Sequence, residues 1–280
     1  MALAKVNGIT LGYDDYGDGD PVVLVTGTGA PGRIWRTHQV PALRGAGHRV
    51  ITVDNRGIPP TDAGPGDFTL GDLVADVAAL IEHLDVGPCR IVGFSLGAVI
   101  VQELLVARPD LVREAVLMAT KARTDTFGAA VTAGDIELAE SGVTLPPRYA
   151  AVVTAMQNLS ARTLGDHERM RDWLDILEIS AVSPASIRPQ LGLQLIADRR
   201  AAYRRIDRPC LVIGFADDLV TRPQLCREVA EAIPGAVYHE IDGCGHFGYL
   251  ERPAEVNAAI IGFFRRDAAE PVTLGATSAT

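Results

Sequence analysis

Short apolar runs alternate with helical patterns along much of the chain. Continuous apolar runs bounded by glycine, proline or polar residues are typical of strands that are buried on both faces of a sheet. Between these runs, apolar residues recur every three or four positions, which predicts helices. This alternation predicts an α/β fold with a mostly parallel sheet covered by helices on both faces. The expected strands are 21–25, 49–53, 89–94, 112–119, 210–215 and 236–241, and the expected helices are 37–46, 70–84, 96–107, 223–233 and about 253–266.

Two segments depart from this alternation. Residues 4–16, with an Asn-Gly turn at 7 and 8, predict a hairpin of two short strands. Between 120 and 206 the apolar spacing is helical, with one stripe from Tyr149 to Leu159 and another that contains Trp173. A helical insertion after a parallel strand lies where open α/β sheets bind ligands, so we expect a cap over a pocket.

These patterns predict how the chain is divided. We expect an α/β core of residues 1–120 and 207–267, and a helical cap of residues 121–206. The tail, residues 268–280, has few apolar residues that a core could bury. It is therefore expected to be mobile.

The bulk composition argues against several classes of partner. With 280 residues, the chain is long enough to bury a substantial core. Its formal net charge of -9 at pH 7 argues against nucleic-acid binding, which needs clustered cationic side chains. No apolar stretch approaches the roughly 20 residues that span a bilayer, so no membrane partner is expected. A small molecule is the expected partner.

Cysteine and histidine positions favour neither disulfides nor a metal site. The four cysteines lack C-x-x-C spacing, and the six histidines form no close pair with the spacing of metal ligands. The N-terminal residues MALAKVNGIT lack the apolar core of a secretion signal. We therefore expect a cytoplasmic protein without a metal or another cofactor.

The loop after the first buried strand has two interpretations. The sequence VTGTGAPGR contains G-x-G-x-x-G at Gly27, Gly29 and Gly32, and Asp54 follows about twenty residues later. In a dinucleotide-binding fold these residues would hold a pyrophosphate and a ribose. Glycines permit close approach of the backbone to a small oxyanion equally well. The pattern alone therefore does not separate a cofactor site from a catalytic loop.

A nucleophile motif stands at the junction of strand 89–94 and helix 96–107. The sequence GFSLG at 93–97 matches G-x-S-x-G, which places Ser95 on a sharp turn between a strand and a helix. The two glycines lack the side chains that would collide where strand and helix pass closely. The backbone N–H of Leu96 lies at the amino end of the helix, where it can stabilise an oxyanion.

A serine nucleophile needs a histidine base and a carboxylate that orients the histidine. Both are expected downstream, and two later strands each end with a suitable residue. Asp217 follows one of these strands, and His246 follows the other. The G-x-x-D spacing favours Asp217 over its neighbour Asp218, and Asp125, after an earlier strand, is a further alternative.

With these residues the chain resembles the α/β-hydrolase superfamily, in particular its group of lid-bearing serine esterases, haloperoxidases and epoxide-hydrolase-like proteins. The resemblance covers roughly residues 5–266, and it includes DNRGIPPTD at 54–62 and GCGHFGYLERP at 243–253. It implies an eight-stranded sheet with a helical cap inserted after the sixth strand. It also implies that Ser95, Asp217 and His246 form a catalytic triad.

The resemblance has consequences for the glycine-rich loop and for the reaction. In this family the loop after the third strand supplies a second oxyanion N–H, which corresponds to Thr28 here, after Thr26-Gly27 in place of a frequent His-Gly pair. Asp54 then becomes a structural turn residue. Epoxide hydrolases and haloalkane dehalogenases of this fold carry an aspartate at the elbow, so Ser95 favours acyl chemistry.

We therefore expect a serine hydrolase that acts on an ester, thioester or related acyl bond of a small, partly apolar molecule through an acyl-enzyme. Acyl transfer, C–C bond hydrolysis and cofactor-free perhydrolysis or haloperoxidation use the same triad and stay open. A non-catalytic ligand receptor on this scaffold is the alternative outside enzymes. Candidates for an apolar pocket are Trp35, Ile58, Phe94 and Trp173, although core packing explains each of them equally well.

Overall fold

The computed structural model describes residues 1–180 and 184–266, and its strands form one eight-stranded sheet. The strand order is β1-β2-β4-β3-β5-β6-β7-β8. β2 is antiparallel to both of its neighbours, and all other neighbouring strands are parallel. The expected α/β fold with a mostly parallel sheet is therefore confirmed. The strands are β1 Ala2–Val6, β2 Ile9–Tyr16, β3 Asp20–Val25, β4 His48–Val53, β5 Cys89–Phe94, β6 Val112–Met118, β7 Cys210–Phe215 and β8 Val237–Ile241.

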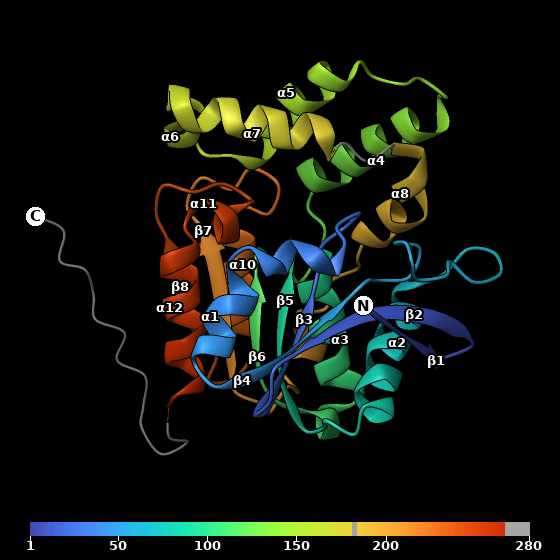
Figure 1. The fold of residues 1–280 in the computed structure, drawn as a ribbon, viewed down its shortest axis with the longest axis vertical. Coiled ribbons are helices and arrows are strands. Elements are labelled where there is room, and N and C mark those ends of the chain that lie inside the picture. Colours follow the sequence, from blue (N-terminus) through green and yellow to red (C-terminus); the bar gives the residue numbers. More distant parts are fainter. Residues whose placement is uncertain (181–183, 267–280) are drawn as a thin grey trace, which may run out of the picture.

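Helices cover both faces of the sheet, as Figure 1 shows. One apolar core lies between the sheet and the helices α2, α3 and α10, and a second lies between the sheet and the helices α1 and α12. Because both faces are covered, the central strands β5 and β7 are buried along their whole length. The helices around the sheet are α1 Gln39–Gly45, α2 Leu70–His83, α3 Leu96–Ala107, α10 Pro223–Ala232, α11 Gly248–Glu251 and α12 Pro253–Phe264, with the 3-10 helices η1 Gly32–Arg36 and η2 Pro109–Leu111.

The described residues between β6 and β7 form helices and connecting segments, with no strand among them. In Figure 1 the helices α5, α6 and α7 lie beyond the strand ends to which the arrowheads point. The helical insertion thus lies at the carboxyl edge of the sheet. Its assignment as a separate cap of residues 121–206 stays a prediction, and the tail 268–280 lies outside the described residues. The helices are α4 Thr126–Glu140, α5 Pro147–Asn158, α6 Ala161–Leu164, α7 His167–Ile179, α8 Pro184–Leu191 and α9 Arg200–Tyr203, with η3 Gly192–Gln194.

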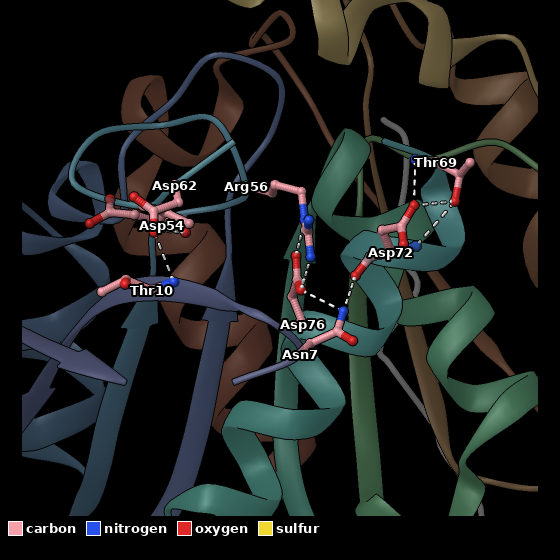
Figure 2. A network of polar contacts seen from close by, with 9 residues as sticks. Asn7, Thr10, Asp54, Arg56, Asp62, Thr69, Asp72 and Asp76 are labelled. Atoms are coloured by element: carbon pink, nitrogen blue, oxygen red, sulfur yellow. Dashed lines mark hydrogen bonds and ion pairs between the residues drawn. The ribbon is translucent and has the colours of Figure 1, made fainter. Parts of the chain in front are cut away.

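Local sequence explains where α2 begins and which side it buries. The Thr69 hydroxyl accepts a hydrogen bond from the Asp72 N–H, and the Asp72 carboxylate accepts one from the Thr69 N–H, as drawn in Figure 2. This reciprocal cap satisfies two donors that the first helical turn would otherwise leave without partners. Leu73, Val77 and Leu80 then recur at helical spacing and are buried in the core.

The expectation that the apolar stripe from Tyr149 to Leu159 forms the buried face of α5 is wrong in part. Tyr149 and Met156 are 58% and 60% exposed, whereas the buried positions of the helix are Ala151 and Ala155. Alanines allow α5 to approach α7 closely, and they pack in one cluster with Leu177 of that helix. Small residues therefore form the buried face of α5, which the spacing of large apolar side chains does not indicate. No described helix is long and apolar enough to cross a membrane.

Candidate active site

Ser95 lies on the sharp turn that the G-x-S-x-G motif predicts. β5 ends at Phe94 and α3 begins at Leu96, so Ser95 alone forms the junction. Its backbone has φ 54° and ψ -118°, a strained conformation for a residue with a side chain. The Ser95 N–H donates to the Met118 carbonyl oxygen at the end of β6, 3.0 Å away, which ties the turn to the neighbouring strand.

The two glycines of the motif are required because other backbone atoms lie where a side chain would start. A Cβ at Gly93 would lie 2.5 Å from the Gly97 oxygen, and a Cβ at Gly97 would lie 2.2 Å from the Val25 oxygen. Both contacts are with backbone, which cannot turn aside as a flexible side chain could. Strand β3, strand β5 and the start of α3 can therefore approach closely enough to build the turn.

We expect Gly97→Ala to lower the free energy of unfolding by about 3 kcal/mol or more, because the added methyl overlaps the Val25 carbonyl. The matched control is Gly134→Ala in α4, where a Cβ would meet nothing within 4 Å. That variant is expected to be stabilised by roughly 0.5–1 kcal/mol, since alanine is the better helix former. Urea unfolding of both variants measures the difference, and equal stabilities would contradict this packing.

His246 lies in the loop after β8, and a buried glutamate holds this loop. Glu251 of α11 accepts the Gly245 N–H at 2.7 Å. The same carboxylate accepts the Ser160 N–H at 3.1 Å and the Ser160 hydroxyl at 2.7 Å. In addition, the Phe247 N–H donates to the Asn158 oxygen at 3.0 Å. The residues on both sides of His246 are thus fixed against the end of α5.

Removal of this carboxylate is expected to destabilise the protein. Glu251→Ala leaves the buried N–H groups of Gly245 and Ser160 without their acceptor, so we expect a loss of about 3 kcal/mol in the free energy of unfolding. Glu255→Ala is the control, because the Glu255 side chain is 53% exposed, and its expected change is about 0.5 kcal/mol or less. Chemical unfolding measures both, and similar losses in the two variants would show that Glu251 does not anchor the loop.

The structure pairs His246 with Asp218, so the preference for Asp217 as its partner is wrong. His246 Nδ1 lies 2.7 Å from Asp218 Oδ2, and the Asp218 side chain is completely buried. The other carboxylate oxygen of Asp218 accepts the N–H groups of Val220 and Thr221, each at 2.8 Å. These bonds turn the Asp218 side chain inward, whereas Asp217 is exposed.

The further alternative, Asp125, has other partners. Its Oδ1 accepts the Gly128 N–H at 2.8 Å and so caps the amino end of α4. Its Oδ2 forms an ion pair with Arg222. Asp125 therefore fixes the start of the helical insertion.

Ser95 and His246 lie within hydrogen-bonding distance of each other. His246 Nε2 is 3.1 Å from Ser95 Oγ, and both residues are buried. An ionised Asp218 can only accept a hydrogen bond, so the proton of a neutral His246 sits on Nδ1. Nε2 is then free to accept the Ser95 proton, which is the arrangement that activates a serine hydroxyl.

Thr28 lies in a tight turn beside Ser95. The Ala30 N–H donates to the Gly27 oxygen at 3.3 Å, and Gly29, with φ 70°, has the conformation of the third residue of a type II turn. A Cβ at Gly27 would lie 3.1 Å from the Ser95 Cβ. No described residue accepts a hydrogen bond from the backbone N–H of Thr28 or of Leu96. Both groups are therefore free to bind a ligand.

The remaining glycine of the G-x-G-x-x-G pattern contacts Asp54. The Gly32 N–H donates to Asp54 Oδ1 at 2.6 Å, which joins the Thr28 loop to the turn after β4. Burial raises the pKa of the Asp54 carboxyl, and the hydrogen bond from Gly32 opposes this effect. The contact agrees with a structural role for Asp54.

The four candidate pocket residues have different surroundings. Phe94 and Trp173 lie against the histidine loop: the Phe94 ring is 4.9 Å from the His246 ring, and the Trp173 ring stacks 6.4 Å from Phe247. Ile58 is buried. Trp35 is fully buried against Tyr249, with ring centroids 5.0 Å apart, which indicates core packing.

A cavity of about 770 Å³ lies away from these groups, between α2, α3 and the segment 192–199. None of the predicted site residues lines it. The described residues hold no cluster of three or more His, Cys, Asp or Glu side chains that could bind a metal ion. All four cysteines are buried and free.

Three residues around the site were not found from the sequence. Glu251 lies in the segment GCGHFGYLERP, five residues after His246, and this proximity was the available signal. Gln190 and Gln194 contact the Thr28 loop, 161 and 166 positions away in the chain. Neutral glutamines in a helical segment carry no pattern that would have identified them.

Comparison with known proteins gives one family and several relatives. The model of the alpha/beta hydrolase family matches residues 22–259. The "Putative non-heme bromoperoxidase BpoC" of Mycobacterium tuberculosis (strain CDC 1551 / Oshkosh) is 49% identical over 91% of this chain and 98% of its own. The pimeloyl-[acyl-carrier protein] methyl ester esterase of Chromobacterium violaceum is 28% identical, over 90% of this chain and 97% of its own. Among solved structures, Rv0554 from Mycobacterium tuberculosis superposes with a TM-score of 0.88 at 48% identity, over 91% of this chain and 93% of that one.

Proposed function

Because the chain belongs to the alpha/beta hydrolase family, we propose that it is a serine hydrolase that cleaves an ester, thioester or related acyl bond of a small, partly apolar molecule. The observation that carries this proposal is the chain of contacts from Ser95 through His246 to Asp218, with separations of 3.1 and 2.7 Å. This order of groups activates the hydroxyl as a nucleophile, because the imidazole can take its proton and the buried carboxylate orients the imidazole.

In the first half of the reaction, His246 Nε2 takes the proton of Ser95 Oγ as the oxygen attacks the acyl carbon. The carbonyl electrons move to the carbonyl oxygen, and the N–H groups of Leu96 and Thr28 stabilise the resulting oxyanion. The oxyanion then re-forms the carbonyl, the bond between the acyl carbon and the leaving group breaks, and the imidazolium gives its proton to the leaving group, so that the acyl group remains on Ser95. Throughout, Asp218 accepts the Nδ1–H of His246 and stabilises its positive charge.

In the second half, an acceptor attacks the acyl-enzyme and His246 takes the acceptor's proton. The bond from the acyl carbon to Ser95 Oγ then breaks, and His246 returns the proton to Ser95 Oγ. With water as acceptor, the product is a carboxylic acid and Ser95 is regenerated. Phe94 and Trp173, which lie beside the histidine loop, are the residues we assign to an apolar wall of the substrate site. Apolar walls exclude water from the oxyanion and strengthen its interaction with the two N–H groups.

A second function is favoured by one specific observation, the 49% identity to a relative named as a non-heme bromoperoxidase. With hydrogen peroxide as acceptor, the acyl-enzyme yields a peracid in place of the acid, and Ser95 is again regenerated. The same three side chains serve both reactions, so the choice depends on which acceptor reaches the acyl group. Transfer to an alcohol differs from hydrolysis in the acceptor. C–C bond cleavage differs from it in the bond that is broken.

Kinetics on a panel of acyl donors and acceptors tests the proposal. Short aryl esters and thioesters are supplied with water alone, with added methanol, or with added hydrogen peroxide, and the acid, methyl ester and peracid are quantified. We expect the acid to be the main product, formed at a rate that does not depend on peroxide. Peracid as the main product would favour the second function, and donors that raise the thermal stability of the protein without turnover would favour a receptor.

A further inference from the structure

The turn that carries Thr28 is held by residues from the helical insertion. The Gly29 N–H donates to Gln190 Oε1 of α8 at 2.8 Å, and Gln194 Nε2 of η3 donates to the Thr28 hydroxyl at 2.5 Å. A Cβ at Gly29 would lie 2.8 Å from Ile187 of α8, so this turn also packs directly against the helix. Three side chains from one segment therefore contact two successive residues of the turn.

The hydrogen bond that closes this turn determines where the Thr28 N–H points. In the peptide group between Gly27 and Thr28, the carbonyl oxygen is bound by the Ala30 N–H inside the turn. Because the N–H of a trans peptide points opposite to its carbonyl, the Thr28 N–H faces out of the turn. Gln190 accepts the N–H of the following peptide group, at Gly29, and so ties the turn to α8.

Gln190 is itself anchored in the core of the fold. It is buried, and its Nε2 donates to the Arg56 carbonyl oxygen at 2.9 Å. Figure 2 shows the Arg56 side chain pointing to Asp76 of α2, to which it donates two hydrogen bonds, at 2.6 and 2.8 Å. Asp76 also accepts a hydrogen bond from Asn7 at 2.8 Å. Gln190 therefore joins the Thr28 turn to a loop that a buried ion pair holds in place.

We propose that Gln190 is a positioning residue of the oxyanion hole, an inference that rests on the proposed function. Its amide fixes the Thr28 turn so that the Thr28 N–H meets the oxyanion that forms on attack by Ser95. Because Gln190 belongs to the helical insertion, the oxyanion hole is complete only while α8 is seated on the turn. Movement of α8 away from the core would remove one oxyanion donor from its position.

Gln190→Met tests the proposal, since methionine has a similar volume but offers no comparable acceptor or donor. We expect kcat for a short aryl ester to fall about 10- to 100-fold, the range for a misplaced oxyanion donor, with KM within about threefold of the wild type. Affinity for a trifluoromethyl ketone analogue of the ester, whose adduct carries an oxyanion, is expected to fall by the same factor. Affinity for the product carboxylic acid is expected to stay within about threefold.

A second variant and a control keep the test independent of folding. Gln194→Met removes only the part-buried hydrogen bond to the Thr28 hydroxyl, and we expect it to lower kcat about 3- to 10-fold, with the same split between the two inhibitors. Gln157→Met makes the same chemical change at an exposed position of α5, and its kcat is expected to equal that of the wild type.

Wild-type kcat in both Gln190→Met and Gln194→Met would overturn the proposal. So would a loss that falls on KM alone, with equal weakening of the ketone and the carboxylic acid. A wild-type protein that neither turns over acyl donors nor reacts with a fluorophosphonate would instead contradict the proposed function. The two failures are therefore distinguishable.

Discussion

Ser95→Ala is expected to lower kcat for a short aryl ester on the order of 10⁶-fold and to abolish reaction with a fluorophosphonate. The reason is geometric, because His246 Nε2 lies 3.1 Å from Ser95 Oγ, and within the described residues its hydrogen-bonding partner is this hydroxyl. The Leu96 and Thr28 N–H groups remain in the variant, so a small residual rate above that in water is expected. Initial rates with excess enzyme, together with labelling by a fluorophosphonate, measure the effect.

The control for this substitution is Ser141→Ala, which removes an exposed hydroxyl from the helical insertion. It is expected to keep the wild-type rate and labelling. Ser95→Ala is also expected to unfold at a concentration of urea close to that of the wild type, because the change removes only the hydroxyl oxygen. Undiminished labelling in Ser95→Ala would mean that the reactive hydroxyl lies elsewhere.

Asp218→Asn is expected to lower kcat about 10⁴-fold, the second largest effect. Asparagine can keep the bonds from the Val220 and Thr221 N–H groups through its carbonyl oxygen. Its amide N–H₂ group then faces His246 Nδ1 and donates to it. That reverses the tautomer, places the imidazole proton on Nε2, and leaves no base for the Ser95 hydroxyl.

Asp217→Asn is the matched control at the adjacent position. Asp217 is exposed, and its backbone N–H, which the substitution keeps, donates to the Cys244 oxygen at 3.0 Å. We expect its kcat to lie within about twofold of the wild type, since it lacks contact with His246. Comparison of kcat for the two variants decides between the carboxylates, and a larger loss in Asp217→Asn would reverse the assignment made from the structure.

Local sequence was enough to locate Ser95 and His246. A glycine on each side of Ser95 and the apolar run before it determine a turn whose geometry depends on neighbours in the chain. His246 follows a strand of the same parallel sheet, so its loop must emerge at the same edge as the end of β5. Parallel topology thus converts strand ends into spatial neighbours, even at a separation of 151 residues.

The choice between Asp217 and Asp218 could not be made in this way. Both follow β7, and spacing from the strand favoured the first. The inward carboxylate was selected by the N–H groups of Val220 and Thr221, which the loop brings onto one oxygen of Asp218. These hydrogen bonds depend on the backbone path of the whole loop, and the residue types alone do not predict that path.

The contacts of the helical insertion were the least accessible from sequence. Gln190 lies 161 residues from Gly29 in the chain, and a glutamine carries no charge or motif that marks it as a contact of a distant turn. On α5, the expected apolar stripe included Tyr149, yet alanines form the buried face. Long-range packing therefore determines both the contact of Gln190 and the buried face of α5. Neither charge nor hydrophobic periodicity in the sequence predicts these two features.

The site of covalent modification tests most directly whether Ser95 is the nucleophile. The protein is incubated with a fluorophosphonate or a slowly hydrolysed aryl ester, digested, and analysed by mass spectrometry of its peptides. We expect one adduct, on the peptide that carries Ser95, formed far more slowly in Asp218→Asn than in Asp217→Asn. An adduct on any other residue, or the same adduct mass on Ser95→Ala, would contradict it.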